Sequence, residues 1–157
     1  KEEILDTLFL ERWDVMLAAI AEADASKRLP REKLHAIASF IIESYRHDPE
    51  LMKVIIVEVT RAVNTFGRTH LAKIRDAYAQ IAKIVARAQA DGLFRSEITP
   101  EFAALAFYGS IEQVLTAWIF ERVPVGDEEL ERAKTLIVET ICRGLERSGG
   151  VVAAISD

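Results

Sequence analysis

The sequence predicts an all-α protein of about six helices. Apolar residues recur at helical spacing almost throughout the 157 residues, and no stretch alternates between apolar and polar residues as a half-buried strand does. Half of the residues are hydrophobic, with only seven Gly and four Pro. This composition excludes a disordered chain, and the length allows one domain that buries its own core.

The first predicted helix runs from the start of the chain to about Ala25, where a polar break follows. Its apolar side consists of Leu5, Leu8, Phe9, Met16 and Ile20. The second helix begins at Pro30, because proline fits the first turn, where its missing N–H leaves no bond unmade. It ends near His47, since the residue before Pro49 avoids the helical region. Its apolar side consists of Leu34, Ile37, Ala38, Ile41 and Tyr45.

The third and fourth helices differ in how their apolar residues are distributed. Asp48 is a predicted N-cap for a helix from Pro49 to about Val63, which is apolar nearly all round and is therefore expected to be buried on most sides. After a break, the fourth helix continues to about Asp91, with Gly92 as its terminating glycine. One stripe of it is apolar: Leu71, Ile74, Tyr78, Ile81, Val85 and Ala88. The opposite stripe is polar: Lys73, Asp76, Gln80, Lys83 and Arg87.

The fifth helix is predicted to begin after the cap Thr99, with Pro100 in its first turn, and to run to about Arg122. It is almost apolar enough for a membrane span. Glu112 and Gln113 at its middle would be costly in lipid, so we predict a helix buried on two sides in a protein without a membrane segment.

The sixth helix runs from about Asp127 to Arg147 and is acidic at its start, as the helix dipole favours. Its apolar stripe consists of Leu130, Ala133, Ile137, Ile141 and Leu145. We therefore expect one domain over residues 1–148 and a flexible tail over residues 149–157.

Charge and cysteine content restrict the function classes. The net charge of −5 argues against nucleic-acid binding by this chain alone, because phosphate binding needs a clustered positive surface. The single cysteine, Cys142, excludes a disulfide framework and fits a reducing compartment such as the cytoplasm. The chain begins with Lys1 rather than Met, so we expect it to be the rear part of a longer protein.

Several stretches resemble the C-terminal, ligand-sensing domain of TetR-family transcriptional regulators. They are Lys1-Glu2-Glu3-Ile4-Leu5 with Leu8-Phe9, Gly92-Leu93-Phe94-Arg95, Thr99-Pro100-Glu101-Phe102-Ala103-Ala104, Phe107-Tyr108-Gly109-Ser110-Ile111-Glu112 with Trp118, and Gly144-Leu145. The resemblance implies a helix-turn-helix head, missing here, that would make all DNA contacts. It also implies a ligand pocket in each subunit and ligand binding that alters operator affinity. The 108–112 and 116–118 regions are most similar to fatty-acid-degradation regulators of the FadR kind, which implies an acyl-CoA effector.

The last two helices are predicted to form a four-helix bundle with their copies in a homodimer. Candidate interface residues are Gly109, Gln113, Ala117, Ile137, Ile141, Gly144 and Leu145. The alternative is that these positions belong to the core of one chain.

A hydrophobic effector pocket is predicted where aromatic and polar side chains interrupt apolar helix faces. The candidate ligand-binding residues are Trp13, Phe66, Arg75, Tyr78, Ile81, Tyr108, Glu112 and Leu115. Glu112 needs a partner, because a buried carboxylate without one is costly. That partner is Arg61, Arg68, Arg75 or a ligand, and both a structural ion pair and a pocket role remain open. A CoA head would need the basic residues Arg61, Arg68, Lys73 or Arg75 at the mouth.

The enzyme and metal hypotheses fail for lack of residues. Glu32-x-x-His35 is half of a di-iron motif, and the second half is absent from the sequence. Cys142 lies in an apolar stripe without a histidine beside it in the sequence. We therefore predict no catalytic residue, no metal and no cofactor. The alternative to a sensor is a helical protein–protein interaction module without an effector.

Overall fold

The computed structural model describes residues 2–62, 68–121 and 125–146, with all of their side chains except those of residues 2, 3, 5, 58–62, 68 and 69. Within these ranges the chain forms six α-helices and no strand. The helices are α1 (Glu2–Ala25), α2 (Pro30–His47), α3 (Pro49–Ala62), α4 (Arg68–Ala90), α5 (Pro100–Ile119) and α6 (Asp127–Leu145). The predicted all-α class and the order of the helices are therefore confirmed.

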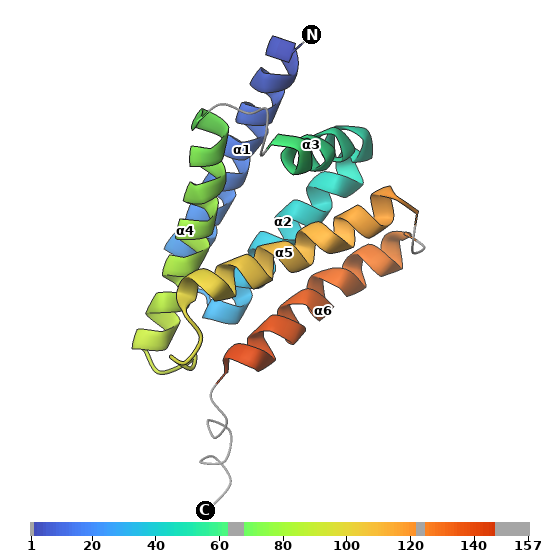
Figure 1. Ribbon diagram of the computed structural model, residues 1–157. Helices are drawn as coiled ribbons and strands as arrows, with labels where there is room; N and C mark the ends of the chain where they lie inside the picture. Colours follow the sequence, from blue (N-terminus) through green and yellow to red (C-terminus); the bar gives the residue numbers. More distant parts are fainter. Residues whose placement is uncertain (1, 63–67, 122–124, 147–157) are drawn as a thin grey trace, which may run out of the picture.

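The helices form two groups that meet at α5 (Figure 1). α1 and α4 lie side by side, and α5 and α6 form an antiparallel pair that packs on α2. α3 lies at one end of the molecule and makes its main contacts with α2 and α5. α5 contacts α2, α3, α4 and α6, and α2 contacts all five other helices.

Local signals set most of the helix ends. The Leu51 N–H donates to Asp48 Oδ1 at 3.0 Å, and the Phe102 N–H donates to Thr99 Oγ1 at 3.3 Å, so both predicted caps are confirmed. Gly92 has a φ of +73°, the left-handed conformation expected of a terminating glycine. α5 ends at Ile119, earlier than predicted, and Glu121 then turns with a φ of +52°. The predicted ends at Val63, Arg122 and Arg147 and the tail lie outside the described residues.

The apolar faces of α2 and α6 lie in the core as predicted. The prediction for α3 is wrong: among its described side chains only Ile56 is buried, and Val54 is 38% exposed. The reason is its position at the end of the molecule, where α2 and α5 cover part of its circumference. Leu8 and Leu71, predicted to be buried, are exposed near the projecting ends of α1 and α4 (Figure 1).

α5 is the one helix in the described part of the chain that is long and apolar enough to cross a membrane by length and composition alone, with a mean hydropathy of 1.2. Its packing accounts for this composition. Phe107, Ile111 and Leu115 are almost completely buried among the surrounding helices. These residues place one side of α5 in the core of the fold, whereas Phe102 and Leu105 of the same helix are exposed.

Candidate ligand-binding cavity

α1, α2, α3 and α5 surround a cavity of about 60 Å³. Of the residues predicted to bind ligand, four line it: Trp13, Tyr108, Glu112 and Leu115. Sequence reasoning missed the rest of the wall, which includes Met16, Phe40, Ile41, Met52, Ile55, Ile56 and Ile111. These residues lie on ordinary apolar helix faces, and such faces carry no signal that separates a cavity wall from a filled core.

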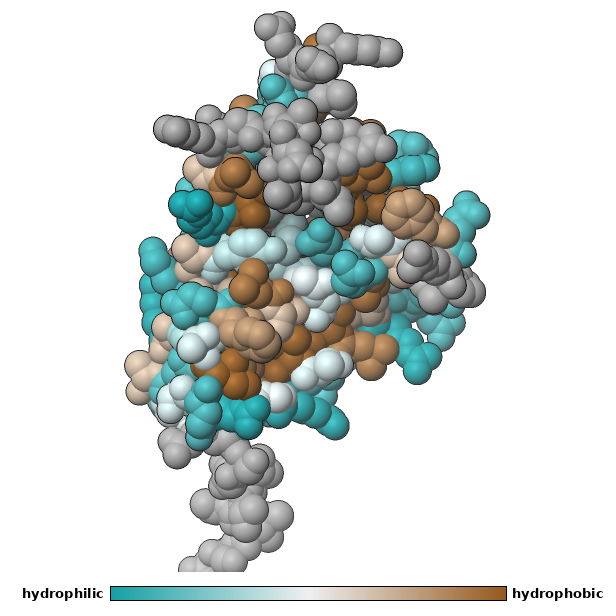
Figure 2. Space-filling model, in the orientation of Figure 1, coloured by the Kyte–Doolittle hydropathy of each residue, from teal (hydrophilic) through white to brown (hydrophobic). Residues whose placement is uncertain are grey.

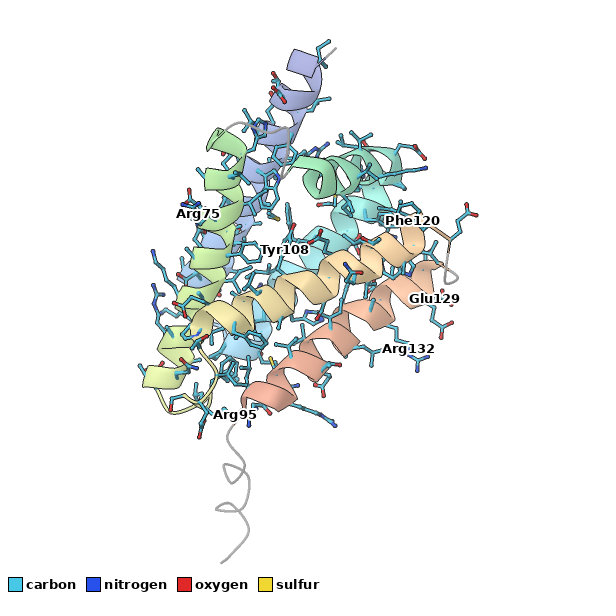
Figure 3. The ribbon with its side chains drawn as sticks, viewed as in Figure 1. Arg75, Arg95, Tyr108, Phe120, Glu129 and Arg132 are labelled. Atoms are coloured by element: carbon cyan, nitrogen blue, oxygen red, sulfur yellow. The ribbon has the colours of Figure 1, made fainter. Side chains whose placement is uncertain are left out.

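The other predicted ligand residues lie elsewhere. Tyr78 packs against the ring of Tyr108 rather than on the cavity wall, and Ile81 is fully buried in the core. Arg75 is exposed on the outer side of α4, away from Tyr108 (Figure 3). Phe66 lies outside the described residues, as do the side chains of Arg61 and Arg68.

Aromatic rings form one side of the cavity. The ring centroids of Trp13 and Tyr108 are 6.1 Å apart, and Tyr78 meets Tyr108 edge-on with 5.2 Å between centroids. Phe9 extends the row, with its centroid 5.8 Å from that of Trp13. This row of rings connects α1, α5 and α4. A displacement of one ring at the cavity therefore affects the packing of three helices.

Glu112 lies one turn beyond Tyr108 on α5 and lines the same cavity. Its carboxylate has no hydrogen-bond or ion-pair partner among the described residues, and burial raises its pKa above the ordinary glutamate value. Burial, and then the nearby charge of Glu112, raise the pKa of Tyr108 far above its usual range. The pKa of Tyr78 is raised by the same two causes. Glu112 thus lies on the cavity wall and makes no ion pair with a described residue.

Three other polar groups belong to the wall. The buried indole N–H of Trp13 has no acceptor among the described residues. Ser44 Oγ donates to the Phe40 carbonyl at 2.8 Å and is therefore satisfied. Arg12 is exposed, as is Val15 on the same helix, so the cavity reaches solvent beside α1.

Away from the cavity, α5 and α6 also present apolar residues to solvent (Figure 2). The exposed large side chains are Phe102, Leu105, Phe120 and Leu136. Of the predicted interface residues, Gln113 and Gly144 are exposed, whereas Gly109, Ala117 and Ile141 are half-buried.

Two predicted interface positions need correction. Ile137 and Leu145 are 6% and 3% exposed and belong to the core of this chain, so they offer little surface to a second copy. The exposed face of α6 contains Glu129, Arg132 and Leu136 instead, and Arg132 points away from the body (Figure 3). A shift of one residue turns a helix face by about 100°, which accounts for the difference.

The residues considered for catalysis have local partners or are buried. Glu32 Oε2 accepts from the Leu29 N–H at 2.9 Å, and His35 Nδ1 lies 3.3 Å from Ser39 Oγ. In the described part of the chain, no three His, Cys, Asp or Glu side chains gather as metal ligands would. Cys142 is fully buried, and burial raises the pKa of its thiol to about 11, which makes it a poor nucleophile.

The all-α fold agrees with a match to a known domain family. The sequence model of the tetracyclin repressor-like C-terminal domain matches residues 30–141. The chain belongs to this family. No curated protein sequence matches it. The resemblance to TetR regulators drawn from the sequence is therefore confirmed at the level of the family.

Solved structures with the same fold support this TetR assignment. A Rhodococcus sp. RHA1 protein of unknown function has a TM-score of 0.73 and 17% identity over 94% of this chain and 75% of its own. SmeT, the repressor of the Stenotrophomonas maltophilia multidrug efflux pump SmeDEF, has a TM-score of 0.66 and 17% identity over 94% and 70%. A SmeT–triclosan complex has a TM-score of 0.64 and 18% identity over 94% and 71%.

Proposed function

We propose that this TetR-type regulatory domain senses a hydrophobic small molecule in the cavity between α1, α2, α3 and α5 and that it acts as a homodimer in the cytoplasm. The observation that carries the proposal is the cavity wall itself. It combines an apolar surface with a carboxylate on Glu112 and an N–H on Trp13 that have no partner among the described residues. Buried polar groups without partners cost stability in a plain core and are expected in a site that a ligand completes.

The cavity of about 60 Å³ must expand to hold an effector, because ligand pockets usually measure about 300–1,000 Å³. α3 is the element that can move, since its described side chains other than Ile56 are half-buried or exposed and its main contacts are to α2 and α5. Met16 and Met52 in the wall are flexible side chains that can repack around a ligand.

We expect α1 to transmit the effect of ligand binding to the DNA-binding head. Arg12, Trp13 and Met16 of α1 belong to the wall, so a ligand that prefers an expanded cavity also prefers one position of α1. In a TetR-type repressor the helix corresponding to α1 follows the DNA-binding head. The effect on operator affinity can be no larger than the difference in ligand affinity between the two arrangements.

Two effector chemistries follow from the comparisons and the sequence. The solved complex of SmeT with triclosan makes a chlorinated aromatic a suitable probe for this chain. The resemblance to fatty-acid-degradation regulators makes acyl-CoA a second candidate, and the exposed Arg12 at the opening would favour its anionic head. Glu112 opposes a buried fatty carboxylate, because like charges in an apolar site repel.

The test is a thermal-shift and calorimetric titration with triclosan, decanoate and decanoyl-CoA. We expect saturable stabilisation by at least one of them. Val15→Trp should weaken this binding by about tenfold or more, because a large side chain at the opening occupies the entrance. Ala18→Trp, one turn further along α1 and away from the cavity, is the matched control and should bind as the wild type does.

The competing proposal is a helical interaction module without an effector. It predicts no saturable stabilisation by any of the three compounds. It also predicts identical titrations for the wild type and the two tryptophan variants.

A further inference from the structure

We infer that the cavity selects lipophilic cations: a positively charged group, such as a quaternary ammonium, lies against Glu112, and the apolar remainder lies against Tyr108 and Trp13. This inference rests on the proposed sensing function and specifies the ligand class of that site.

The first argument is the unpaired carboxylate. Glu112 lies on the cavity wall among Ile111, Leu115 and the rings of Tyr108 and Trp13, without an ion-pair partner in the described part of the chain. A carboxylate in such surroundings is stabilised by a counter-charge more than by any uncharged group. An occupant that carries a positive charge supplies what the wall lacks.

The second argument is the arrangement of the aromatic rings. Tyr108 stands between Trp13 and Tyr78, with centroid separations of 6.1 Å and 5.2 Å. Tyr108 and Glu112 are four residues apart on α5, so the ring and the carboxylate project on one side of the helix. Aromatic faces attract ammonium groups, and this attraction adds to that of the carboxylate in a desolvated site.

The third argument is that no basic side chain in the described part of the chain is paired with Glu112. Arg12, the basic side chain among the described residues of the wall, is exposed and makes no ion pair with Glu112. Lys73 forms an ion pair with Asp14 instead, and Arg75 points outward from α4 (Figure 3). A neutral or anionic occupant would leave the carboxylate without a counter-charge.

The experiment compares three probes that differ mainly in charge: phenyltrimethylammonium, its uncharged isostere tert-butylbenzene, and benzenesulfonate. Binding is followed by tryptophan fluorescence and ligand-observed NMR. We expect the cation to bind about tenfold or more tighter than the isostere, and the sulfonate to bind weakest. Glu112→Gln should remove the preference for the cation over tert-butylbenzene.

The matched control is Glu22→Gln, which makes the same change in net charge on the exposed side of α1 and should keep the wild-type preference. Equal affinities for the cation and the isostere, or a preference that survives in Glu112→Gln, would overturn the cation inference and leave the sensing function standing. Failure of all three probes and of the hydrophobic compounds tested above would overturn both.

Discussion

At Glu112 the protein places a carboxyl group where burial opposes its charge. The proposed ligand chemistry of the cavity depends on the same residue. The negative charge that would bind a cation therefore lowers the stability of the folded chain without ligand. The buried indole N–H of Trp13 on the same wall also has no acceptor among the described residues, whereas Ser44 bonds to its own helix. A cluster of unsatisfied groups around one cavity is the usual mark of a binding site.

Replacing this carboxyl group should stabilise the domain at neutral pH. The pKa of Glu112 is raised by burial in the folded chain, so ionisation destabilises the folded state, and stability falls as pH rises through that pKa. Glu112→Gln removes this cost. We expect the free energy of unfolding at pH 7.5 to increase by about 0.5–2 kcal/mol, the usual size of a single stabilising change.

Urea unfolding of the two proteins at pH 7.5 and at pH 5 measures the effect. The difference should shrink at the lower pH, where the wild-type carboxyl group gains its proton. A variant that is less stable than the wild type at both pH values would show that the carboxylate has a partner in solution.

Among the elements, α3 is weakly enclosed: of its described side chains, only Ile56 is buried. The side chains of α3 that line the cavity, Met52, Ile55 and Ile56, face the core from one side, while Val54 faces solvent. α2 and α6 are held together by ion pairs instead: Lys134 of α6 is paired with Glu43 of α2, and Arg46 Nη2 of α2 lies 2.7 Å from Asp127 Oδ1 of α6. The difference suggests which helix yields when the cavity expands.

We therefore predict that α3 opens more readily than its neighbours. Its backbone amides should exchange hydrogen about tenfold or more faster than those of α2 in the free protein, because few buried contacts hold it. A compound that gives saturable thermal stabilisation should slow exchange in α3 and leave the ion-paired half of α6 unchanged. Hydrogen-exchange mass spectrometry measures both. Equal protection of α3 and α2, with no response to the compound, would place the expansion in another helix.

On the scale of the whole molecule, α5 contributes side chains to two surfaces, the cavity wall and an exposed apolar face. It places Tyr108 and Glu112 on the cavity wall and, together with α6, exposes Phe102, Phe120 and Leu136. Figure 2 shows these two helices with apolar residues at the surface. This face suits the proposed two-fold interface, because it can be buried in a four-helix bundle without disturbing the cavity.

The proposed dimer can be tested at Leu136, which is 50% exposed on α6. Leu136→Asp should weaken dimerisation by about a hundredfold or more, because the two-fold axis places two unpaired carboxylates in an apolar contact. The matched control is Leu29→Asp: Leu29 is 62% exposed before α2, and aspartate suits this N-cap position. Analytical ultracentrifugation at micromolar concentration measures the change. A monomeric wild type at that concentration would overturn the dimer.

The sequence alone was enough to predict the helices, because their signals are local. Asp48 and Thr99 accept hydrogen bonds from the first turns that follow them, and Gly92 adopts the left-handed conformation that ends α4. These interactions span a few residues, so they can be read without knowing the fold.

Tertiary packing alone decided which apolar residues surround the cavity, and which face of α6 is left exposed. Ile81 and Leu115 have the same character in the sequence, yet Ile81 fills the core and Leu115 lines the cavity. Leu136 and Ile137 are neighbours of similar hydrophobicity, and only the approach of α2 and α5 to α6 buries one and exposes the other. Burial depends on contacts between distant helices, and hydrophobic attraction has no direction that a local pattern could record.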